Sequence, residues 1–344
     1  MPAENNKALV RRCRSLLGLL FLAMLAPLHA AAQAPSDHAP MTREAFDALL
    51  ARVDNTGRWG ELDQMGTLNL ITPEVRLQAF QEVRDGGTVS LAHELVAGPI
   101  PGAFEEMQLD FMALSDTVLG PADGSVSWAL ERFGLVFHGL SVTHVDALSH
   151  MSYRDRVYNA PAAFDPDGMP ARNNIGEMRA GIVTRAVLVD VPRLRGIPDL
   201  AGDVTVTVAD LEAWEQRAGI RVRSGDVLLI RFGHLAREAA LDPSGMGDPM
   251  PRIHPSVALW LQERGVSALG ADFNDGAPSL VPGINTPLHV LALVAMGMPL
   301  FDNMELEELA REAADRSRYS FLFMASPLWI RGATGSPLNP LAVF

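Results

Sequence analysis

Two apolar runs constrain the fold of this chain more than any other feature. They are "GIVTRAVLVDV" (181–191) and "GDVLLIRFG" (225–233), in which β-branched and other apolar residues are nearly continuous. Such runs are typical of strands that are buried on both faces, as in a sheet covered by helices. Between them, "TVADLEAW" places Asp210 three residues after Thr207, which is the pattern of a helix N-terminal capping box. This order of strand, helix and strand indicates a mixed α/β (α+β) fold.

Further helices and strands alternate along the rest of the chain. Three of the expected helices begin at a threonine, Thr42, Thr72 or Thr286, and the last two stop at a glycine, Gly265 or Gly297. The helical segments are "MTREAFDALLARV" (41–53), "TPEVRLQAFQEV" (72–83), "PSVALWLQERG" (255–265) and "TPLHVLALVAMG" (286–297), with a strand, "VSALGADF" (266–273), between the last two. No internal repeat or linker-like composition follows residue 40, so we expect one domain over residues 41–344.

The first 32 residues have the features of an export signal. Lys7, Arg11, Arg12 and Arg14 form a basic start, "LLGLLFLAMLAPL" (16–28) is a short apolar run, and "HAAAQA" offers small residues for cleavage. The apolar run is too short for an ordinary transmembrane helix. We therefore expect a protein that is exported, to the periplasm or out of the cell, after removal of residues 1–32.

The composition of the remaining chain excludes several kinds of chemistry. Lys7 and Cys13 are the only lysine and the only cysteine, so their removal excludes a lysine Schiff base, a cysteine nucleophile and disulfides. Residues 1–32 also carry a net charge of +3, so the formal charge changes from −13 to −16 without them. Such acidity argues against nucleic acid or an anionic membrane as a partner. Catalysis would then depend on His, Asp, Glu, Ser, Thr, Tyr and Arg, with or without a metal.

Three of the nine histidines fall within one short stretch, "HGLSVTHVDALSH" (138–150). If the stretch begins as a strand, period-two alternation places Leu140, Val142, His144 and Asp146 on one face. An imidazole and a carboxylate so placed are common ligands of Zn²⁺ or Mn²⁺. The alternative is that His144 and Asp146 only hydrogen-bond each other within the core. This stretch alone allows both interpretations.

A second candidate lies in "INTPLHVLALVAMGMPLFDN" (284–303). His289 falls in the first turn of an otherwise apolar helix, where the positive end of the helix dipole favours the neutral imidazole that can bind a metal. Asp302 follows the next apolar run and adds a carboxylate. The alternative is that His289 is a surface or capping residue.

Seven motifs spread over nearly the whole chain carry a family resemblance. They are "NTGRWGELDQMGTLNLITPEVRLQAF", "THVDALSH", "GIVTRAVLVDVPRLRG", "VTVADLEAW", "GDVLLIRFG", "ALGADF" and "HVLALVAMGMPLFDN". In this order they resemble the metal-dependent cyclase family, which includes bacterial kynurenine formamidases and isatin hydrolases. The resemblance implies a single-domain swivelling β/β/α fold, with a metal held between the second motif and the last.

The resemblance also implies roles for individual residues. His144 and Asp146 match two metal ligands of the family's His-x-Gly-Thr-His-x-Asp-x-Pro-x-His signature, and His150 matches its last histidine, the proposed acid/base. His289 resembles the downstream histidine ligand. Asp302 occupies the place usually held by a glutamate.

Two positions depart from the signature. Leu140 stands where the signature has its first histidine, and Leu148 stands where it has proline. His138 is a further candidate ligand, although on a regular strand it would lie one pleat repeat, ~6.6 Å, from position 140. Because leucine cannot bind a metal, we expect one metal ion per chain.

The expected ligands and His150 together suggest a reaction. Two neutral histidines and two carboxylates suit Zn²⁺ or Mn²⁺ and do not suit soft Cu(I). A water bound to such a metal has a pKa near ~7 and can attack as hydroxide, while His150 passes the proton to the leaving amine. Together with the resemblance, this implies a hydrolase of small-molecule amides (N-formyl, as in an arylformamidase) or of cyclic imides and lactams, working as a homo-oligomer (dimer or tetramer). The alternative is a binding protein or pseudoenzyme that keeps the fold and part of the metal site without turnover.

A few other polar and aromatic residues are candidates near such a site. Trp59, Tyr158, Asn159 and Asn174 are candidates for the substrate pocket, although loop asparagines mostly serve turns and tryptophan is by default a core residue. Asp272, at the end of "ALGADF", is a candidate for orienting a histidine ligand.

Overall fold

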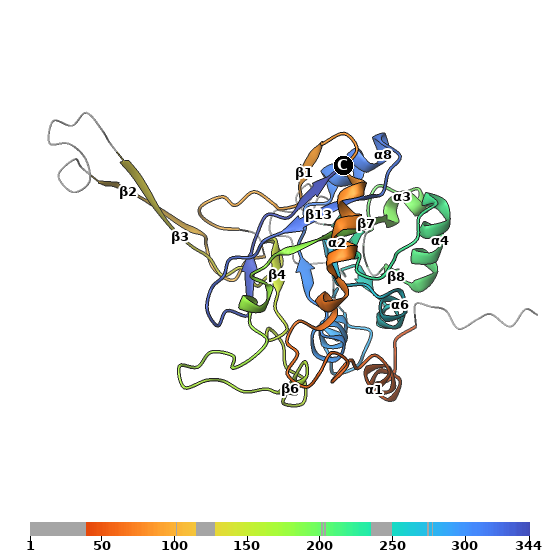
Figure 1. Cartoon of the computed structure of the whole chain (residues 1–344), viewed down its shortest axis with the longest axis horizontal. Helices are drawn as coiled ribbons and strands as arrows, with labels where there is room; N and C mark the ends of the chain where they lie inside the picture. Colours follow the sequence, from red (N-terminus) through yellow and green to blue (C-terminus); the bar gives the residue numbers. More distant parts are fainter. Residues whose placement is uncertain are drawn as a thin grey trace, which may run out of the picture. The chain divides into compact units, whose positions relative to one another are not determined.

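A nine-stranded mixed sheet forms the centre of the computed structural model (Figure 1). The structure describes residues 39–100, 102–114, 128–200, 202, 204–234, 250–273, 275–276 and 278–344. All of them belong to one compact unit, Asp37–Phe344. The expected export signal, residues 1–32, lies outside the described residues.

The four central strands of this sheet are parallel, and antiparallel strands flank them. From edge to edge the order is β1 (Thr88–Ser90), β15 (Leu341–Val343), β13 (Ser320–Ala325), β7 (Ile182–Asp190), β9 (Val227–Arg231), β11 (Ala268–Ala271), β12 (Leu300–Asp302), β4 (His144–Asp146) and β14 (Gly335–Pro337). The two apolar runs predicted to be buried strands are β7 and β9, which are neighbours in the middle of the sheet. The mixed α+β class expected from the sequence is therefore confirmed.

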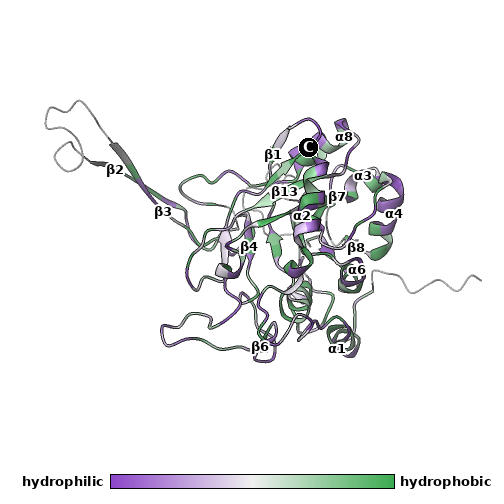
Figure 2. Ribbon diagram, viewed as in Figure 1, coloured by the Kyte–Doolittle hydropathy of each residue, from purple (hydrophilic) through white to green (hydrophobic). Residues whose placement is uncertain are grey.

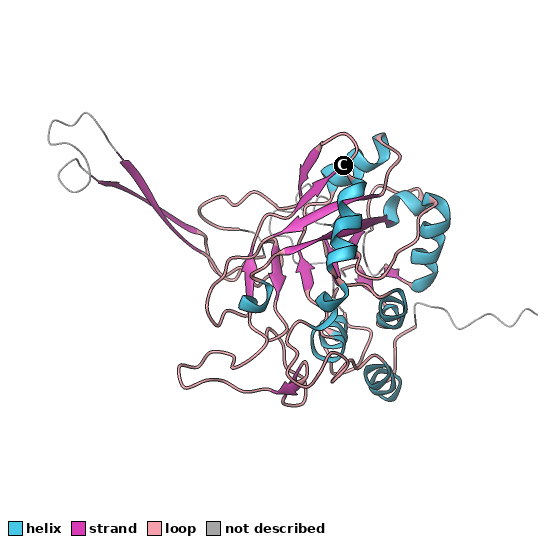
Figure 3. Ribbon diagram, viewed as in Figure 1, coloured by secondary structure: helices cyan, strands magenta, loops and turns pink. Residues whose placement is uncertain are grey.

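The remaining strands form three separate two-stranded sheets. They are β2 (Gln108–Leu114) with β3 (Trp128–Gly134), β5 (Arg156–Val157) with β6 (Ala160–Pro161), and β8 (Thr205–Val206) with β10 (Arg252–Ile253). The helices are α1 (Arg43–Arg52), α2 (Pro73–Ala79), α3 (Val191–Arg195), α4 (Val208–Ala218), α6 (Val257–Arg264), α7 (Pro287–His289) and α8 (Glu307–Asp315), with short helical turns η1 (Gly66–Leu70), η2 (Phe80–Glu82) and η3 (Ile175–Met178). Figure 3 shows these helices grouped around the strands of the large sheet.

Most of the predicted helix ends are confirmed. The hydroxyl oxygens of Thr42 and Thr72 accept hydrogen bonds from the first turns of α1 and α2, Thr207 and Asp210 form the capping box of α4, and α6 ends at Gly265 in the left-handed conformation. The capping role predicted for Thr286 is wrong, because its side chain makes no capping hydrogen bond. The helix that follows it is also unusual, since α7 continues as the π-helix η4 (Val290–Met296) before it ends at Gly297.

The central strands are buried on both faces. Val187, Val189, Leu228 and Ile230 belong to one apolar cluster, and their neighbours in the sequence, such as Leu188 and Leu229, belong to a second cluster. Figure 2 shows hydrophobic colour along β7 and β13. Because alternate residues of a strand point to opposite faces, this division places a core on each side of the sheet. Within the described part of the chain, no helix is long and apolar enough to cross a membrane.

Candidate metal centre

The pairing of β4 with β12 brings three candidate ligands together. The two strands are antiparallel, with Asp302 opposite His144 and Leu300 opposite Asp146. His144 and Asp146 are two residues apart and so point to the same face of the sheet. The Nε2 atom of His144 lies 3.4 Å from Oδ1 of Asp146, and the His144 Nδ1 atom is 2.7 Å from the carbonyl oxygen of Val142. That carbonyl contact fixes the orientation of the ring.

The path of the chain before β4 differs from the expected strand. Only His144–Asp146 are in a strand, and residues 138–142 form a series of bends. The expectation that Leu140 and Val142 share a strand face with His144 is therefore wrong. The bends turn the ring of His138 back to the site, with Nδ1 3.1 Å from Oδ1 of Asp146. The spacing of a regular strand, which separates His138 from the site, does not apply here.

His289 approaches Asp146 from the start of α7. Its Nε2 atom lies 3.1 Å from Oδ2 of Asp302 and 3.7 Å from Oδ2 of Asp146. Its Nδ1 atom lies 2.7 Å from Oδ2 of Asp275, and the Asp275 carboxylate also accepts the backbone N–H groups of Leu288 and His289. Asp275 therefore both caps the helix and orients the ring.

Asp275 was not found by the sequence reasoning, which considered Asp272 for this orienting role. Asp272 instead accepts the backbone N–H groups of Phe232 and Gly233 and is buried. The two aspartates follow the same strand, β11, only three residues apart, so the sequence offered no means of choosing between them.

The donor atoms form two overlapping groups that share Asp146. One group is His138, His144 and Asp146, and the other is Asp146, His289 and Asp302, and within each group the donor atoms lie within 4.8 Å of one another. Imidazole nitrogen and carboxylate oxygen are the donors that Zn²⁺ and Mn²⁺ accept. The structure thus brings together every ligand predicted from the sequence, including His138.

The Asp146 carboxylate gives the clearest sign that these groups fit a cation. Its side chain is fully buried, yet neither oxygen has a hydrogen-bond partner, and Nδ1 of His138 also has none although it lies close. Buried carboxylates are normally paired, hydrogen-bonded or bound to a metal. A divalent cation between these donors would satisfy both oxygens, so the residues present fit a metal.

The neighbouring charges shift the pKa values of the site. Burial alone would raise the pKa of Asp146, but His138 and His144 hold it far below its usual range. Burial would lower the pKa of His289, but Asp302 and Asp275 raise it well above normal. Burial lowers the pKa of His150 to about 4, against the attraction of Asp146. Because a histidine ligand must be neutral, protons compete with a metal at His289.

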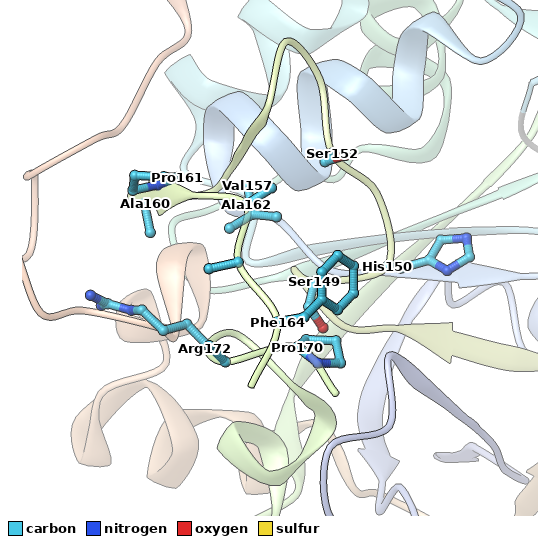
Figure 4. Close-up of a pocket in the computed structure, with 12 residues that line it drawn as sticks. Ser149, His150, Ser152, Val157, Ala160, Pro161, Ala162, Phe164, Pro170 and Arg172 are labelled. Atoms are coloured by element: carbon cyan, nitrogen blue, oxygen red, sulfur yellow. The ribbon is translucent and has the colours of Figure 1, made fainter. Parts of the chain in front are cut away.

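His150 lies between the donor groups and a pocket. Its Nε2 atom is 3.8 Å from Oδ2 of Asp146, and its ring is stacked on that of His138, with centroids 4.0 Å apart and planes within 11°. The pocket has a volume of about 290 Å³. Figure 4 shows His150 at one end of the pocket and Arg172 at the other, with Phe164 and Pro170 between them. The other residues that line it are Ser149, Ser152, Val157, Ala160, Pro161, Ala162, Ala163 and Ala171.

The four residues predicted to line the substrate pocket do not line this one. Tyr158 is fully buried and donates a hydrogen bond to Asp63, and Asn159 holds the backbone of residues 57–63 through four hydrogen bonds. Asn174 caps η3. Trp59 packs against the core beneath the guanidinium of Arg58. Asn174 thus has the turn role, and Trp59 the core contact, that the sequence offered as alternatives.

Several known proteins are similar to this chain. A family model described as putative cyclase matches residues 89–275, more than half of the chain. A crystal structure described as a novel cyclase is 31% identical with a TM-score of 0.77, over 86% of this chain and 99% of that one. Isatin hydrolase A from Ralstonia solanacearum is 24% identical with a TM-score of 0.50, over 77% of this chain and 93% of that one. Isatin hydrolase A from Labrenzia aggregata, bound to benzyl benzoate, is 23% identical with a TM-score of 0.52, over 77% of this chain and 94% of that one. The search of curated proteins gave no match.

Proposed function

Because the chain belongs to the putative cyclase family, we propose that it is a metal-dependent hydrolase that opens the C–N bond of a small amide, cyclic imide or lactam. The observation that carries this proposal is the buried Asp146 carboxylate, which has no hydrogen-bond partner and lies between two groups of metal-binding donors. The isatin hydrolases share the fold at low sequence identity, and their name supports the choice of a cyclic amide bond as one substrate class.

Two divalent ions, Zn²⁺ or Mn²⁺, would be held by these donors. His138 and His144 would hold one, His289 and Asp302 the other, and Asp146 would serve both. The single ion expected from the sequence rested on Leu140, and the position of His138, 3.1 Å from Asp146, instead supports a second ion. When bound, such ions polarise a carbonyl group and lower the pKa of a coordinated water.

His150 would move the proton in this reaction. Its Nε2 atom lies 3.8 Å from Oδ2 of Asp146, and the residue borders the pocket. A neutral imidazole at this position can accept a proton from water at Nε2 and return it to the leaving nitrogen. Its stacking on His138 restricts the ring to this place.

The pocket beside His150 favours a small apolar substrate with an acidic group. Phe164, Pro161, Pro170 and several alanines give it an apolar wall. The Nε atom of Arg172 is buried without a hydrogen-bond partner, and its Nη2 atom donates a long hydrogen bond, 3.4 Å, to the carbonyl oxygen of Asp63. Among the described residues no carboxylate pairs with it. We therefore favour an N-formyl arylamine that carries a carboxylate, and an arylformamidase-like activity.

The experiment compares formanilide with its 2-carboxylated analogue as substrates. We expect hydrolysis of both by the metal-loaded protein, loss of turnover in a chelator and its return with Zn²⁺ or Mn²⁺. Arg172→Gln should raise KM for the carboxylated substrate only, and Arg179→Gln, an exposed arginine outside the pocket, should change neither. Metal binding without hydrolysis of any amide, imide or lactam in a panel would instead support the binding-protein alternative.

The place of action is a separate proposal that rests on residues 1–32 alone. Their basic start, apolar run and small residues support export to the periplasm or medium. Fractionation of cells that express the full chain, followed by N-terminal sequencing of the product, tests it. Full-length protein that stays in the cytoplasm would contradict it.

A further inference from the structure

Asn303 follows the candidate ligand Asp302 and ends strand β12. Its φ angle is 54°, in the left-handed region where asparagine is more common than most residues. Only 3% of the residue is exposed, so its polar atoms need partners inside the protein. The hydroxyl of Thr143, just before β4, donates a hydrogen bond of 2.6 Å to the Asn303 carbonyl oxygen. The Asn303 backbone is therefore fixed one residue beyond a candidate metal donor.

The side-chain amide of Asn303 holds two carbonyl groups of the bends that precede β4. Its Nδ2 atom donates to the carbonyl oxygen of Gly139 at 2.8 Å and to that of Val142 at 3.2 Å. An amide nitrogen carries two N–H groups, so both act on the same segment. From the backbone, the carbonyl oxygen of Gly102 accepts the N–H of Leu140. Because the bends belong to no strand, these contacts take the place of a sheet ladder in fixing them.

Each of the two carbonyl groups bears on a histidine of the same donor group. The Val142 oxygen also contacts Nδ1 of His144, at 2.7 Å. A carbonyl oxygen can only accept, so Nδ1 carries the proton and Nε2 is left to bind a metal. Gly139 directly follows His138, whose ring belongs to the same donor group as that of His144. One amide, that of Asn303, thus supports two candidate ligands.

We propose that Asn303 is a positioning residue for His138 and His144, and that its amide gives the metal centre a nitrogen ligand where Leu140 offers none. This inference rests on the proposed function, which requires a metal. A regular strand would place His138 one pleat repeat from position 140, so the bends must be held for its ring to reach the site. Loss of a group that orients metal ligands typically weakens metal binding by ~10- to 100-fold.

The other donor group does not depend on this amide. Asp275 orients the ring of His289, and the pairing of β12 with β4 places Asp302. Loss of the Asn303 side chain should therefore weaken one bound ion and leave the other in place. A general loss of structure would weaken both.

The first experiment compares Asn303→Gly with Asn173→Gly. Glycine adopts the left-handed conformation readily, so each change removes an amide without straining the backbone. Asn173 is the matched control, because its φ is 62°, it is 1% exposed, and its Nδ2 donates to the carbonyl oxygen of Tyr158 at 2.7 Å. In competition with a chromophoric chelator, Asn303→Gly should bind one of two ions ~10- to 100-fold more weakly, and Asn173→Gly should bind both normally. Equal effects of the two variants on metal affinity would overturn the proposal.

The second experiment needs no metal. In a chelator, hydrogen–deuterium exchange of residues 138–143 should be faster in Asn303→Gly than in the wild type, and exchange of residues 287–300 should not change. Asn303→Asp keeps the size of the side chain but has no N–H groups to donate. It should show the same faster exchange, and it replaces the glycine variant if that variant does not fold.

Unchanged exchange of residues 138–143 in both Asn303 variants would overturn the proposal. A wild type that binds no metal would contradict the proposed function, whereas faster exchange in the variants would still support the positioning of His138 and His144 by Asn303. The two proposals can thus fail separately.

Discussion

Asp146 is the residue on which the candidate site depends. It contributes an oxygen to each donor group and is fully buried without a hydrogen-bond partner. Its pKa lies far below the usual range because His138 and His144 face it, so the folded protein favours the anion over the protonated form even without a metal. Removal of this charge should therefore reduce both the stability of the protein and its metal binding.

Asp146→Asn tests both effects. We expect the variant to lose all bound metal. In a chelator its free energy of unfolding should be lower than that of the wild type by about 1–3 kcal/mol, because a neutral amide cannot balance the histidines around it. Elemental analysis and urea unfolding measure the two effects. Full metal occupancy in the variant would contradict the role of Asp146 as a ligand.

His138→Ala tests the number of metal ions. The wild type should bind two per chain, and the variant should keep the one held by Asp146, His289 and Asp302. His289→Ala is the matched change in the other donor group and should leave the one ion held by His138, His144 and Asp146. Metal titration followed by anomalous scattering gives the count and the positions. If the wild type holds one ion and His138→Ala leaves it in place, the two-metal proposal is wrong.

His150→Ala separates proton transfer from metal binding. Because His150 belongs to neither donor group, metal content should not change. The value of kcat should fall by ~10²- to 10⁴-fold, the usual range for loss of a general acid or base. If metal content falls together with kcat, then His150 is a ligand and its assignment here is incorrect.

At the scale of the elements, the start of α7 connects helix geometry to the site. The Asp275 carboxylate accepts two backbone N–H groups there and contacts His289 Nδ1. It thus does what Thr286 was expected to do, and it fixes a ligand as well. A carboxylate reaching from a different segment cannot be recognised from the local sequence, which shows only a threonine followed by proline.

Asp275→Ala should therefore have two effects at once. Loss of the cap should reduce the free energy of unfolding by about 1–2 kcal/mol, and loss of the contact to His289 should weaken metal binding by ~10- to 100-fold. Thr286→Ala should change neither by much. Competition with a chromophoric chelator measures the affinity for the metal. Equal effects of Asp275→Ala and Thr286→Ala would contradict the role of Asp275 as cap and as partner of His289.

The sequence predicted the elements that depend on local pattern. The runs that became β7 and β9 are continuous enough to indicate burial on both faces, and the capping box of α4 lies within four residues. It did not predict the shortness of β4 or the bends at 138–142, because these depend on pairing with β12 and β14. In the site, the sequence offered the donor residues as candidates, but it did not show their grouping around Asp146.

At the scale of the whole molecule, one buried group links stability to pH. Burial raises the pKa of Asp272 to about 7. The backbone N–H groups of Phe232 and Gly233 and the charge of Arg231 act in the opposite direction, because they lower this pKa. An aspartate in an unfolded chain titrates near ~3.9. Between these values the folded protein binds more protons than the unfolded chain. The contribution of Asp272 to the free energy of unfolding is therefore fully present below the pKa of the unfolded chain, and it is lost as the pH rises to about 7.

Asp272→Asn removes this linkage. In a chelator, the free energy of unfolding of the wild type should fall relative to that of the variant by about 2–3 kcal/mol between pH 5 and pH 8. Urea unfolding of both proteins across this range measures the difference, and other titrating groups cancel in it. A difference that stays constant, or that changes in the opposite direction, would show that Asp272 is ionised in the folded protein.

The place of β4 in the sheet has a consequence for the order of events in the life of the chain. The donors come from residues 138–146 and from residues 289 and 302, and β4 is held between β12 and β14, which ends at Pro337. A growing chain therefore cannot bring its donors together until residue 302 has emerged and β12 can pair with β4. Pairing over such a separation is among the later steps of folding. We therefore expect a metal ion to be bound late, in the compartment where the sheet is completed.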